Sequence, residues 1–491
     1  MNPIEELSPK LVWKNFYALT QIPRPSGHTE KVANFLVDFA KAHGAEARID
    51  EAGNVIMKKG ATPGYEDRDT AVLQAHMDMV PQKTKESGHN FETDPLDVYI
   101  DGEWVTARNT TLGADDGMGV AAAMAVIEDD SVAHGPIEVL ITKDEETGMY
   151  GAFGLKAGEL EGKYLLNLDS EEEGEITIGC AGGMDVVCKM SYQPMNVEAE
   201  DMVAYKIAIK GLLGGHSGLE ICKGRANANK LMARILFAAV NTNIAWLSSW
   251  HGGNMRNAIP REGEAVVLVP KKSEEEFLNL IEKSKNIFTT EYADIETNGI
   301  TMTATPCEVP TEAIPQEIQE NLINAVMAAH DGVLRYTPSM PELVETSSNL
   351  AIINIEKGNA EVDILARSSQ DSMKLFLCNE LVSCFSMAGM NVALEGGYSG
   401  WQPNPKSKLV AMMSDIYEKM YGKKPVVSAC HAGLECGIIG VNYPKMDMAS
   451  FGPTLVSPHT PSEACLIPSV EKFYAFVVEI LKNIPKKSLE S

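Results

Sequence analysis

The sequence predicts an α/β protein whose mixed sheet is interrupted by an inserted α+β domain. Apolar runs of strand length alternate with helical patterns up to about residue 180, as in βα units that build a mixed or parallel sheet. A chain of 491 residues is also longer than one hydrophobic core normally supports. We therefore expect a main domain in two segments, residues 1–185 and 398–491, with the inserted domain at 186–397 between them.

The elements of the main domain are predicted from the spacing of its apolar residues. Residues 28–43 carry valine, leucine and phenylalanine side chains at three- and four-residue steps, which is the helical period. Residues 120–127 form an unbroken apolar, alanine-rich segment that is typical of a buried helix. The expected strands are the apolar runs at 70–75, 137–142 and 164–168, and further helices are expected at 406–421 and 470–481.

The inserted domain begins with a predicted strand at 203–209 and contains a repeated pattern. Residues 256–268 can be aligned with 348–365, because both segments end in strands of similar outline. Each is followed by an amphipathic acidic helix, at 273–285 and 369–387. We expect an internal duplication, with convergent strand patterning as the alternative.

A histidine and an aspartate lie at the end of one predicted strand. His76 and Asp78 follow the apolar run at 70–75, and residues two apart on a strand point to the same side. The pair can therefore face one point, with His76 as a metal ligand and Asp78 as the carboxylate that orients it. A solvated strand end is the alternative for such a pair taken alone.

Four further groups of acidic or histidine side chains accompany the apolar segments. These are Asp115 with Asp116, Glu145 with Glu146, Asp169, and His459. In open α/β sheets, ligands bind beyond the carboxyl ends of the strands. Histidine with carboxylates is a mixed nitrogen and oxygen ligand set that suits zinc, and a bridging carboxylate suits two zinc ions. Taken alone, the aspartate pair is also explained as the N-cap of the following helix.

Together these motifs resemble the M20 family of metallopeptidases over nearly the whole chain. The matching segments are 74–78, 113–117, 144–148, 167–170, 214–218 and 458–459. The chain is most similar to the aminoacyl-histidine dipeptidase branch of that family, whose members are also called Xaa-His or cytosol non-specific dipeptidases. Segments typical of that branch are 11–16, 22–26, 180–183 and 430–437. The resemblance implies a zinc-peptidase main domain with the inserted domain as its lid.

The resemblance also implies a role for each side chain of the main domain. The implied ligands of two zinc ions are His76, Asp115, Glu146, Asp169 and His459. Asp115 is expected to bridge the ions and to precede a cis peptide bond, and Co²⁺ or Mn²⁺ are expected substitutes for zinc. Glu145 is expected to be the general base that takes a proton from the attacking water. The residues alone leave open which ligand serves which ion.

Three residues of the inserted domain are implied as substrate contacts. His216 is expected to polarise the carbonyl oxygen of the cleaved bond, with a plain turn histidine as the alternative. Asn257 is a second candidate contact. Arg367 follows the predicted strand at 361–366 and matches the family's carboxylate-binding arginine, with a surface arginine as the alternative.

The resemblance therefore predicts a di-zinc dipeptidase that cleaves dipeptides with a free C-terminal carboxylate, Xaa-His dipeptides among them. A deacylase of N-acyl amino acids is the first alternative, because it uses the same metals on another acyl group. A catalytically inactive binding protein of the same fold is the second. The presence of Glu145 and of every ligand argues against that second alternative.

Composition disfavours several other classes of protein. A net charge of −26 disfavours nucleic acid as a partner, since such binding depends on lysine and arginine contacts to phosphate. No segment approaches the roughly 20 apolar residues of a membrane span, and residues 1–6 show no signal-peptide pattern. Nine scattered cysteines without a CxxC spacing are typical of a reducing compartment, so a cytoplasmic location is expected. A homodimer and a monomer are both compatible with the sequence.

Overall fold

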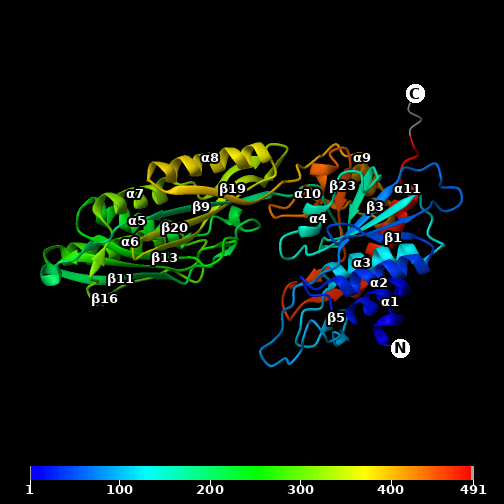
Figure 1. The fold of residues 1–491 in the computed structure, drawn as a ribbon, viewed down its shortest axis with the longest axis horizontal. Helices are drawn as coiled ribbons and strands as arrows, with labels where there is room; N and C mark the ends of the chain where they lie inside the picture. The colour runs from blue at the N-terminus through cyan, green and yellow to red at the C-terminus, as the bar shows by residue number, and fades with distance from the viewer. Residues whose placement is uncertain (1, 488–491) are drawn as a thin grey trace. The chain divides into compact units, whose positions relative to one another are not determined.

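The computed structural model describes residues 2–487, which divide into two compact units (Figure 1). Unit 1 comprises the chain up to Gly179, the segment Pro403–Ala429 and the part from Leu434 onward. Unit 2 comprises Cys180–Gln402 and the short segment Cys430–Gly433. The sequence of unit 2 therefore interrupts that of unit 1 at two places, a long insertion and a segment of four residues.

The centre of unit 1 is an eight-stranded mixed sheet. Its strands, in spatial order, are β1 (Glu46–Ile49), β2 (Val55–Lys59), β6 (Ile137–Thr142), β3 (Ala71–His76), β7 (Tyr164–Asn167), β23 (Asp447–Ser450), β8 (Glu175–Thr177) and β22 (Val426–Ser428). Strands β6, β3, β7 and β23 are parallel neighbours, whereas β2 runs antiparallel to β6. The carboxyl ends of the parallel strands consequently meet at one edge of the sheet, the usual place for a ligand.

Every residue of β3 and β6 is buried, which explains their mostly apolar sequences. The helices of unit 1 are η1 (Pro3–Glu6), α1 (Lys10–Thr20), α2 (Glu30–Ala42), α3 (Ala114–Glu128), α4 (Tyr150–Gly154), α9 (Lys408–Tyr421), α10 (Glu435–Asn442) and α11 (Ile467–Asn483). A second, four-stranded sheet has the order β24 (Leu455–Val456), β25 (Ala464–Leu466), β5 (Trp104–Ala107) and β4 (Val98–Asp101).

Helix α3 begins with an irregular turn that carries the aspartate pair. Asp115 and Asp116 have non-helical backbone angles, and the peptide bond between them is cis, as the family resemblance implies. Oδ1 of Asp116 accepts a hydrogen bond from the backbone N–H of Gly119 at 3.1 Å, so Asp116 caps the regular part of the helix. A Cβ atom at position 119 would collide with that carboxylate, which explains the glycine.

Unit 2 is built on one antiparallel sheet of nine strands. The main path is β16 (Thr301–Cys307), β11 (Met202–Lys210), β15 (Gly263–Pro270), β13 (Trp246–Gly252), β19 (Met340–Glu356), β20 (Asn359–Ser368), β9 (Gly182–Ser191) and β21 (Asn391–Tyr398), and β18 (Gly332–Thr337) pairs with β19. Two short ladders join β10 (Met195–Asn196) to β17 (Glu312–Ala313), and β12 (Gly215–His216) to β14 (Ala258–Ile259).

Helices of unit 2 pack on this sheet through a core that includes Trp250, Phe277 and Phe385. They are η2 (Ala199–Asp201), η3 (Ile221–Lys223), α5 (Ala228–Asn241), η4 (Lys271–Ser273), α6 (Glu274–Glu291), α7 (Gln316–Ala328) and α8 (Asp371–Met387). Helix α6 connects β15 to the edge strand β16, and α8 connects β20 to the opposite edge strand β21. The internal duplication itself stays a prediction. Within residues 2–487, no helix is long and apolar enough to cross a membrane.

Candidate metal centre

The predicted ligands of unit 1 come together at the edge where its parallel strands end. His76 is the last residue of β3, and Asp169 lies two residues beyond β7. Glu145 and Glu146 follow β6. Because these three strands are parallel, their ends deliver the side chains to one side of the sheet. Asp115 reaches the same place from the start of α3, and His459 reaches it from the loop after β24.

Asp115 lies between two sets of side chains. Its Oδ1 is 3.0 Å from Nε2 of His76, and that nitrogen is 3.5 Å from Oδ1 of Asp169. Its Oδ2 is 3.0 Å from Nε2 of His459, and that nitrogen is 3.0 Å from Oε2 of Glu146. Each oxygen of Asp115 therefore faces one histidine nitrogen, and each of these nitrogens also faces one further carboxylate.

Asp78 connects the histidine ligand to the paired glutamates. Its Oδ1 is 3.4 Å from Nδ1 of His76 and accepts the backbone N–H of Glu145 at 3.0 Å. Its Oδ2 accepts the backbone N–H of Glu146 at 3.3 Å and the hydroxyl of Ser26 at 2.8 Å. Asp78 is fully buried, so these contacts replace its hydration.

The carboxylates of this cluster are crowded enough to oppose each other's ionisation. Burial raises the pKa of Asp169 to about 7, and the charges of Asp115 and Glu146 act in the same direction while His76 opposes them. Burial also raises the pKa of Glu145 well above its ordinary value. Hydrogen bonds to Asp115 and Glu146 raise the pKa of His459 to about 11. A bound cation would relieve the repulsion between these carboxylates.

The side chains present fit a metal ion. Donor atoms of His76, Asp115 and Glu146 all lie within 4.8 Å of one another. Oε1 of Glu146 is buried without a hydrogen-bond partner among the described residues, so a ligand would satisfy it. Imidazole with carboxylates is a donor set for zinc and neighbouring transition metals. The cluster is therefore a candidate metal centre, and its five predicted ligands come from five separate segments of unit 1.

A buried polar network beneath the centre was not predicted from the sequence. Oε2 of Glu435 accepts hydrogen bonds from Nε2 of Gln74 and from the hydroxyl of Thr142, both at 2.6 Å. Burial raises the pKa of Glu435 to about 8. The available signal was Gln74, an amide in the middle of the otherwise apolar strand β3, because a buried amide requires polar partners.

Two further buried charges, Arg24 and Glu463, were also missed. Both are almost completely buried. Arg24 donates hydrogen bonds to the backbone oxygens of Met77, Asp78 and Gly113. Arg24 lies inside the segment 22–26 that the sequence singled out, and Glu463 lies four residues beyond His459. A charged residue in or beside such a segment was the signal.

His216 and Asn257 lie next to each other in unit 2. His216 is in β12, which pairs with β14, and the backbone N–H of Ser217 donates to the backbone oxygen of Asn257 at 2.8 Å. Nδ1 of His216 accepts the backbone N–H groups of Gly218 and Leu219 at 3.1 and 3.0 Å. The ring proton of neutral His216 is therefore on Nε2, which makes that nitrogen a donor.

Arg367 lies within strand β20, whereas the sequence placed it just beyond a strand. It is only 5% exposed, so the alternative of a surface arginine is wrong. One guanidinium nitrogen donates to the hydroxyl of Tyr398 at 3.0 Å, and Nε is buried without a partner among the described residues. Burial and then the charge of Arg367 lower the pKa of His216 to about 4.

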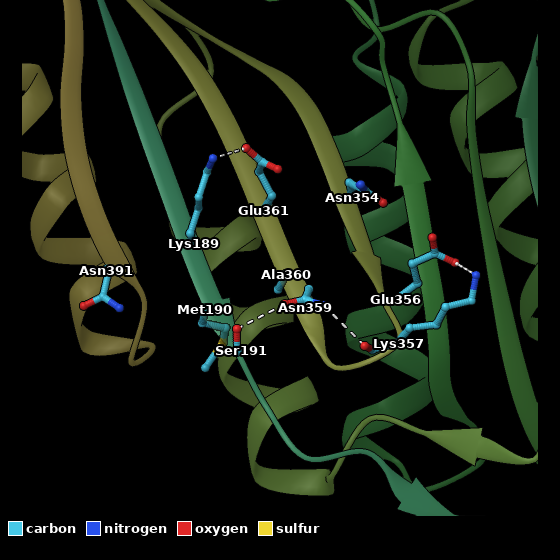
Figure 2. A pocket seen from close by; sticks show the side chains of 10 residues that line it. All are labelled: Lys189, Met190, Ser191, Asn354, Glu356, Lys357, Asn359, Ala360, Glu361 and Asn391. Carbon is cyan, nitrogen blue, oxygen red and sulfur yellow. Dashed lines mark hydrogen bonds and ion pairs between the residues drawn. The ribbon is translucent and has the colours of Figure 1, made fainter.

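A cavity of about 490 Å³ in unit 2 contains none of the predicted site residues (Figure 2). Its charged side chains pair within the wall, because Lys189 lies 2.8 Å from Glu361 and Lys357 lies 3.3 Å from Glu356. These pairs leave no unbalanced charge among the side chains that line the cavity, so it offers no counter-charge for an ionic ligand.

Comparison with known proteins supports the same interpretation. Residues 72–483 match the model of peptidase family M20/M25/M40. The chain is 41% identical over 487 residues to the cytosol non-specific dipeptidase of Escherichia coli (strain K12), covering 99% of this chain and all of that protein. It is 42% identical to the crystal structure of aminoacylhistidine dipeptidase from Vibrio alginolyticus, with a TM-score of 0.92 and 99% of each chain covered.

A more distant structure shares the fold alone. The M20 family metallo-carboxypeptidase from Sulfolobus solfataricus is 15% identical, with a TM-score of 0.52 over 96% of this chain and 98% of that chain. The family match, the full-length relatives and the cluster of metal-ligating side chains agree with one another. This chain belongs to peptidase family M20/M25/M40, and its close relatives are dipeptidases.

Proposed function

We propose that this protein is a di-zinc dipeptidase that hydrolyses dipeptides with a free C-terminal carboxylate, Xaa-His dipeptides among them. The observation that carries the proposal is the geometry at Asp115, whose two oxygens face two different pairs of histidine and carboxylate. A carboxylate in such a position is suited to bridge two metal ions. The names of the two full-length dipeptidase relatives support the substrate class.

Each proposed ion has its own ligands besides the shared Asp115. His76 and Asp169 hold one ion in this proposal, and Glu146 and His459 hold the other. The short distances within each set support this division. Bound zinc, or Co²⁺ or Mn²⁺ in its place, supplies a Lewis acid that polarises a carbonyl group and lowers the pKa of water.

Glu145 is the proposed general base. Its neighbour Glu146 is committed to metal binding, which leaves the Glu145 carboxylate to take a proton from the attacking water. Glu145 then passes that proton to the leaving amine, so the amino acid product departs as a neutral or protonated amine. Asp78 supports this role, because it orients His76 and binds the backbone N–H groups of both glutamates.

Unit 2 supplies the proposed substrate contacts. Nε2–H of His216 is a donor suited to the oxygen of the cleaved carbonyl group, since its Nδ1 is already occupied as an acceptor. Nε of Arg367 has no hydrogen-bond partner within residues 2–487, so it is suited to a substrate carboxylate. Asn257 is a further proposed contact, because it is exposed beside the strand of His216.

The function is tested by supplying the zinc-loaded protein with three substrates. We expect free histidine from Ala-His, little free amino acid from N-acetyl amino acids, and no product after treatment with a chelator. Faster release from N-acetyl amino acids favours the deacylase. An absence of product from every substrate, at full metal content, favours a binding protein without activity.

We propose the cytoplasm as the place of action, which the reducing cysteine pattern and the name of the E. coli relative support. The names of the dipeptidase relatives support small peptides as ligands, and the strongly negative charge argues against nucleic acid. Cell fractionation, with activity recovered in the cytosolic fraction, is the expected result. Light scattering of the purified protein distinguishes a monomer from a homodimer.

A further inference from the structure

The buried carboxylate of Glu463 binds the backbone of four residues, although Glu463 has no part in the proposed reaction. Its side chain is 2% exposed. Oε2 accepts the backbone N–H groups of Leu112 and Gly113 at 2.7 and 3.0 Å. Oε1 accepts those of Ala114 and Asp115 at 2.8 and 3.3 Å. One carboxylate thus binds four consecutive N–H groups that lead to the proposed bridging ligand.

Consecutive N–H groups point to one side only when the backbone adopts an unusual local conformation. Gly113 supplies it, with a φ of 68°. Such a run of N–H groups forms a concave anion site. The carboxylate of Glu463 fills that site from within the protein, and no other group is needed to satisfy these donors.

Arg24 holds the opposite side of the same loop. One guanidinium nitrogen donates to the backbone oxygen of Gly113 at 2.5 Å, and the other donates to the oxygens of Met77 and Asp78 at 3.1 and 3.2 Å. The loop is therefore bound through its N–H groups on one side and through a carbonyl on the other. Arg24 also fastens this loop to the segment that follows His76.

Glu463 in turn belongs to the segment that carries His459. Its backbone N–H donates to the backbone oxygen of Thr460 at 3.0 Å, and its backbone oxygen accepts the hydroxyl of Thr106 at 2.8 Å. The side chain and the backbone of Glu463 therefore connect two ligand-bearing segments that are 344 residues apart in sequence. Together, Arg24 and Glu463 fasten three such segments to one another.

We propose that Glu463 is a positioning residue, which holds the loop 112–115 so that the two oxygens of Asp115 face their two metal ions. This inference rests on the proposed role of Asp115 as a ligand. The position of a bridging carboxylate must satisfy both ions at once, so a small shift of its backbone weakens both sites. Groups that orient metal ligands typically contribute about 10- to 100-fold to metal affinity.

Glu463→Gln is the decisive variant, because it keeps the shape and removes the charge. One oxygen of the carboxylate becomes an amide NH₂ group, which faces two backbone N–H groups and leaves them unpaired. Glu138 offers a control elsewhere in unit 1. One oxygen of this buried carboxylate accepts the backbone N–H groups of Glu161 and Gly162 at 2.8 and 2.9 Å, and the other lies 2.9 Å from Nζ of Lys58. Glu138→Gln therefore removes a buried negative charge from unit 1 without touching the loop 112–115.

The readout is metal affinity, measured by competition with a chelator, together with the visible absorption spectrum of the Co²⁺-loaded protein. We expect Glu463→Gln to bind metal about 10- to 100-fold more weakly and to change the spectrum. Glu138→Gln should match the native protein in both measurements, although both variants lose thermal stability. If Glu463→Gln does not fold, Glu463→Asp keeps the charge, shortens its reach and should weaken metal binding in the same direction.

Asp115→Asn in the same assay distinguishes the role of Asp115 as a metal ligand from the role of Glu463 in positioning Asp115. If Asp115→Asn loses metal and Glu463→Gln binds it as the native protein does, the positioning role is wrong and the ligand role stands. Equal losses in Glu463→Gln and Glu138→Gln also overturn the positioning role, because a general loss of stability then explains them. Native affinity in Asp115→Asn overturns the ligand assignment, and the inference about Glu463 falls with it.

Discussion

A carboxylate oxygen of Asp78 lies 3.4 Å from Nδ1 of His76, while Nε2 of the same ring points at Asp115. The two ring nitrogens of His76 are thus engaged on opposite sides. A carboxylate at the outer nitrogen fixes the orientation of a ligating imidazole and makes it a stronger ligand.

Replacement of Asp78 by asparagine should weaken metal binding about 10- to 100-fold with the protein still folded. The amide keeps some hydrogen bonding but loses the charge that orients His76. Chelator competition measures the effect. Asp447→Asn is a matched control, because Asp447 accepts a hydroxyl and a backbone N–H elsewhere in unit 1, at 2.7 and 3.1 Å. If both variants lose metal affinity to a similar extent, the loss is a general effect of the substitution and the orientation of His76 by Asp78 is contradicted.

Glu145→Gln should lower kcat roughly 10²- to 10⁴-fold while the metal content stays at the native value. The amide cannot accept the proton of the attacking water, but Glu145 is not expected to bind metal. Glu146→Gln is the paired variant and should lose metal. Metal analysis alongside steady-state kinetics checks both. If Glu145→Gln loses metal and Glu146→Gln keeps it, Glu145 is the ligand and Glu146 is the general base.

Arg367→Ala should lower kcat/KM for Ala-His by roughly 10- to 100-fold and leave the poor cleavage of Ala-His-amide almost unchanged. The native protein should strongly prefer the free acid, since only the acid carries the charge that Arg367 binds. Arg234→Ala is the control, because Arg234 is a partly exposed arginine of unit 2 that pairs with Glu291. Equal rates of the native protein on both substrates would falsify carboxylate recognition and weaken the dipeptidase assignment.

His216 and His431 should remain neutral in the folded protein at pH 5 and above. Burial and then the charge of Arg367 lower their pKa values to about 4 and about 3. The unfolded chain takes up these protons near pH 6.5. Their contribution to the free energy of unfolding is therefore fully present above pH 6.5, and it is lost as the pH falls towards 4 for His216 and towards 3 for His431. NMR titration of the imidazole signals measures this, and a midpoint near 6.5 for either ring contradicts the prediction.

Removal of metal should abolish hydrolysis and lower the thermal unfolding temperature. Metal binds the folded protein, so at a concentration 100 times the dissociation constant it adds about 2.7 kcal/mol to the free energy of unfolding. Calorimetry before and after dialysis against chelator checks the stability, and activity is measured after Zn²⁺, Co²⁺ or Mn²⁺ is restored. An unfolding temperature that is independent of metal contradicts the proposed centre.

The sequence by itself determined the mixed α/β character of the main unit and the elements that carry its polar motifs. His76, Asp169 and the paired glutamates were identified because each follows a strand whose apolar sequence is unmistakable. Such short-range patterns reflect local backbone geometry and burial, and both are recorded in neighbouring residues. Resemblance to a known family supplied the expected roles.

Only the tertiary structure decided which distant groups meet. The strand pairing of unit 1 brings Asp115 between His76 and His459, although Asp115 and His459 are 344 residues apart in sequence. Arg24, Glu435 and Glu463 became evident only there, because a buried charge is explained by partners that lie far away in sequence. The sequence supplies the donors and acceptors, and the packing of separate segments against one another determines how they pair.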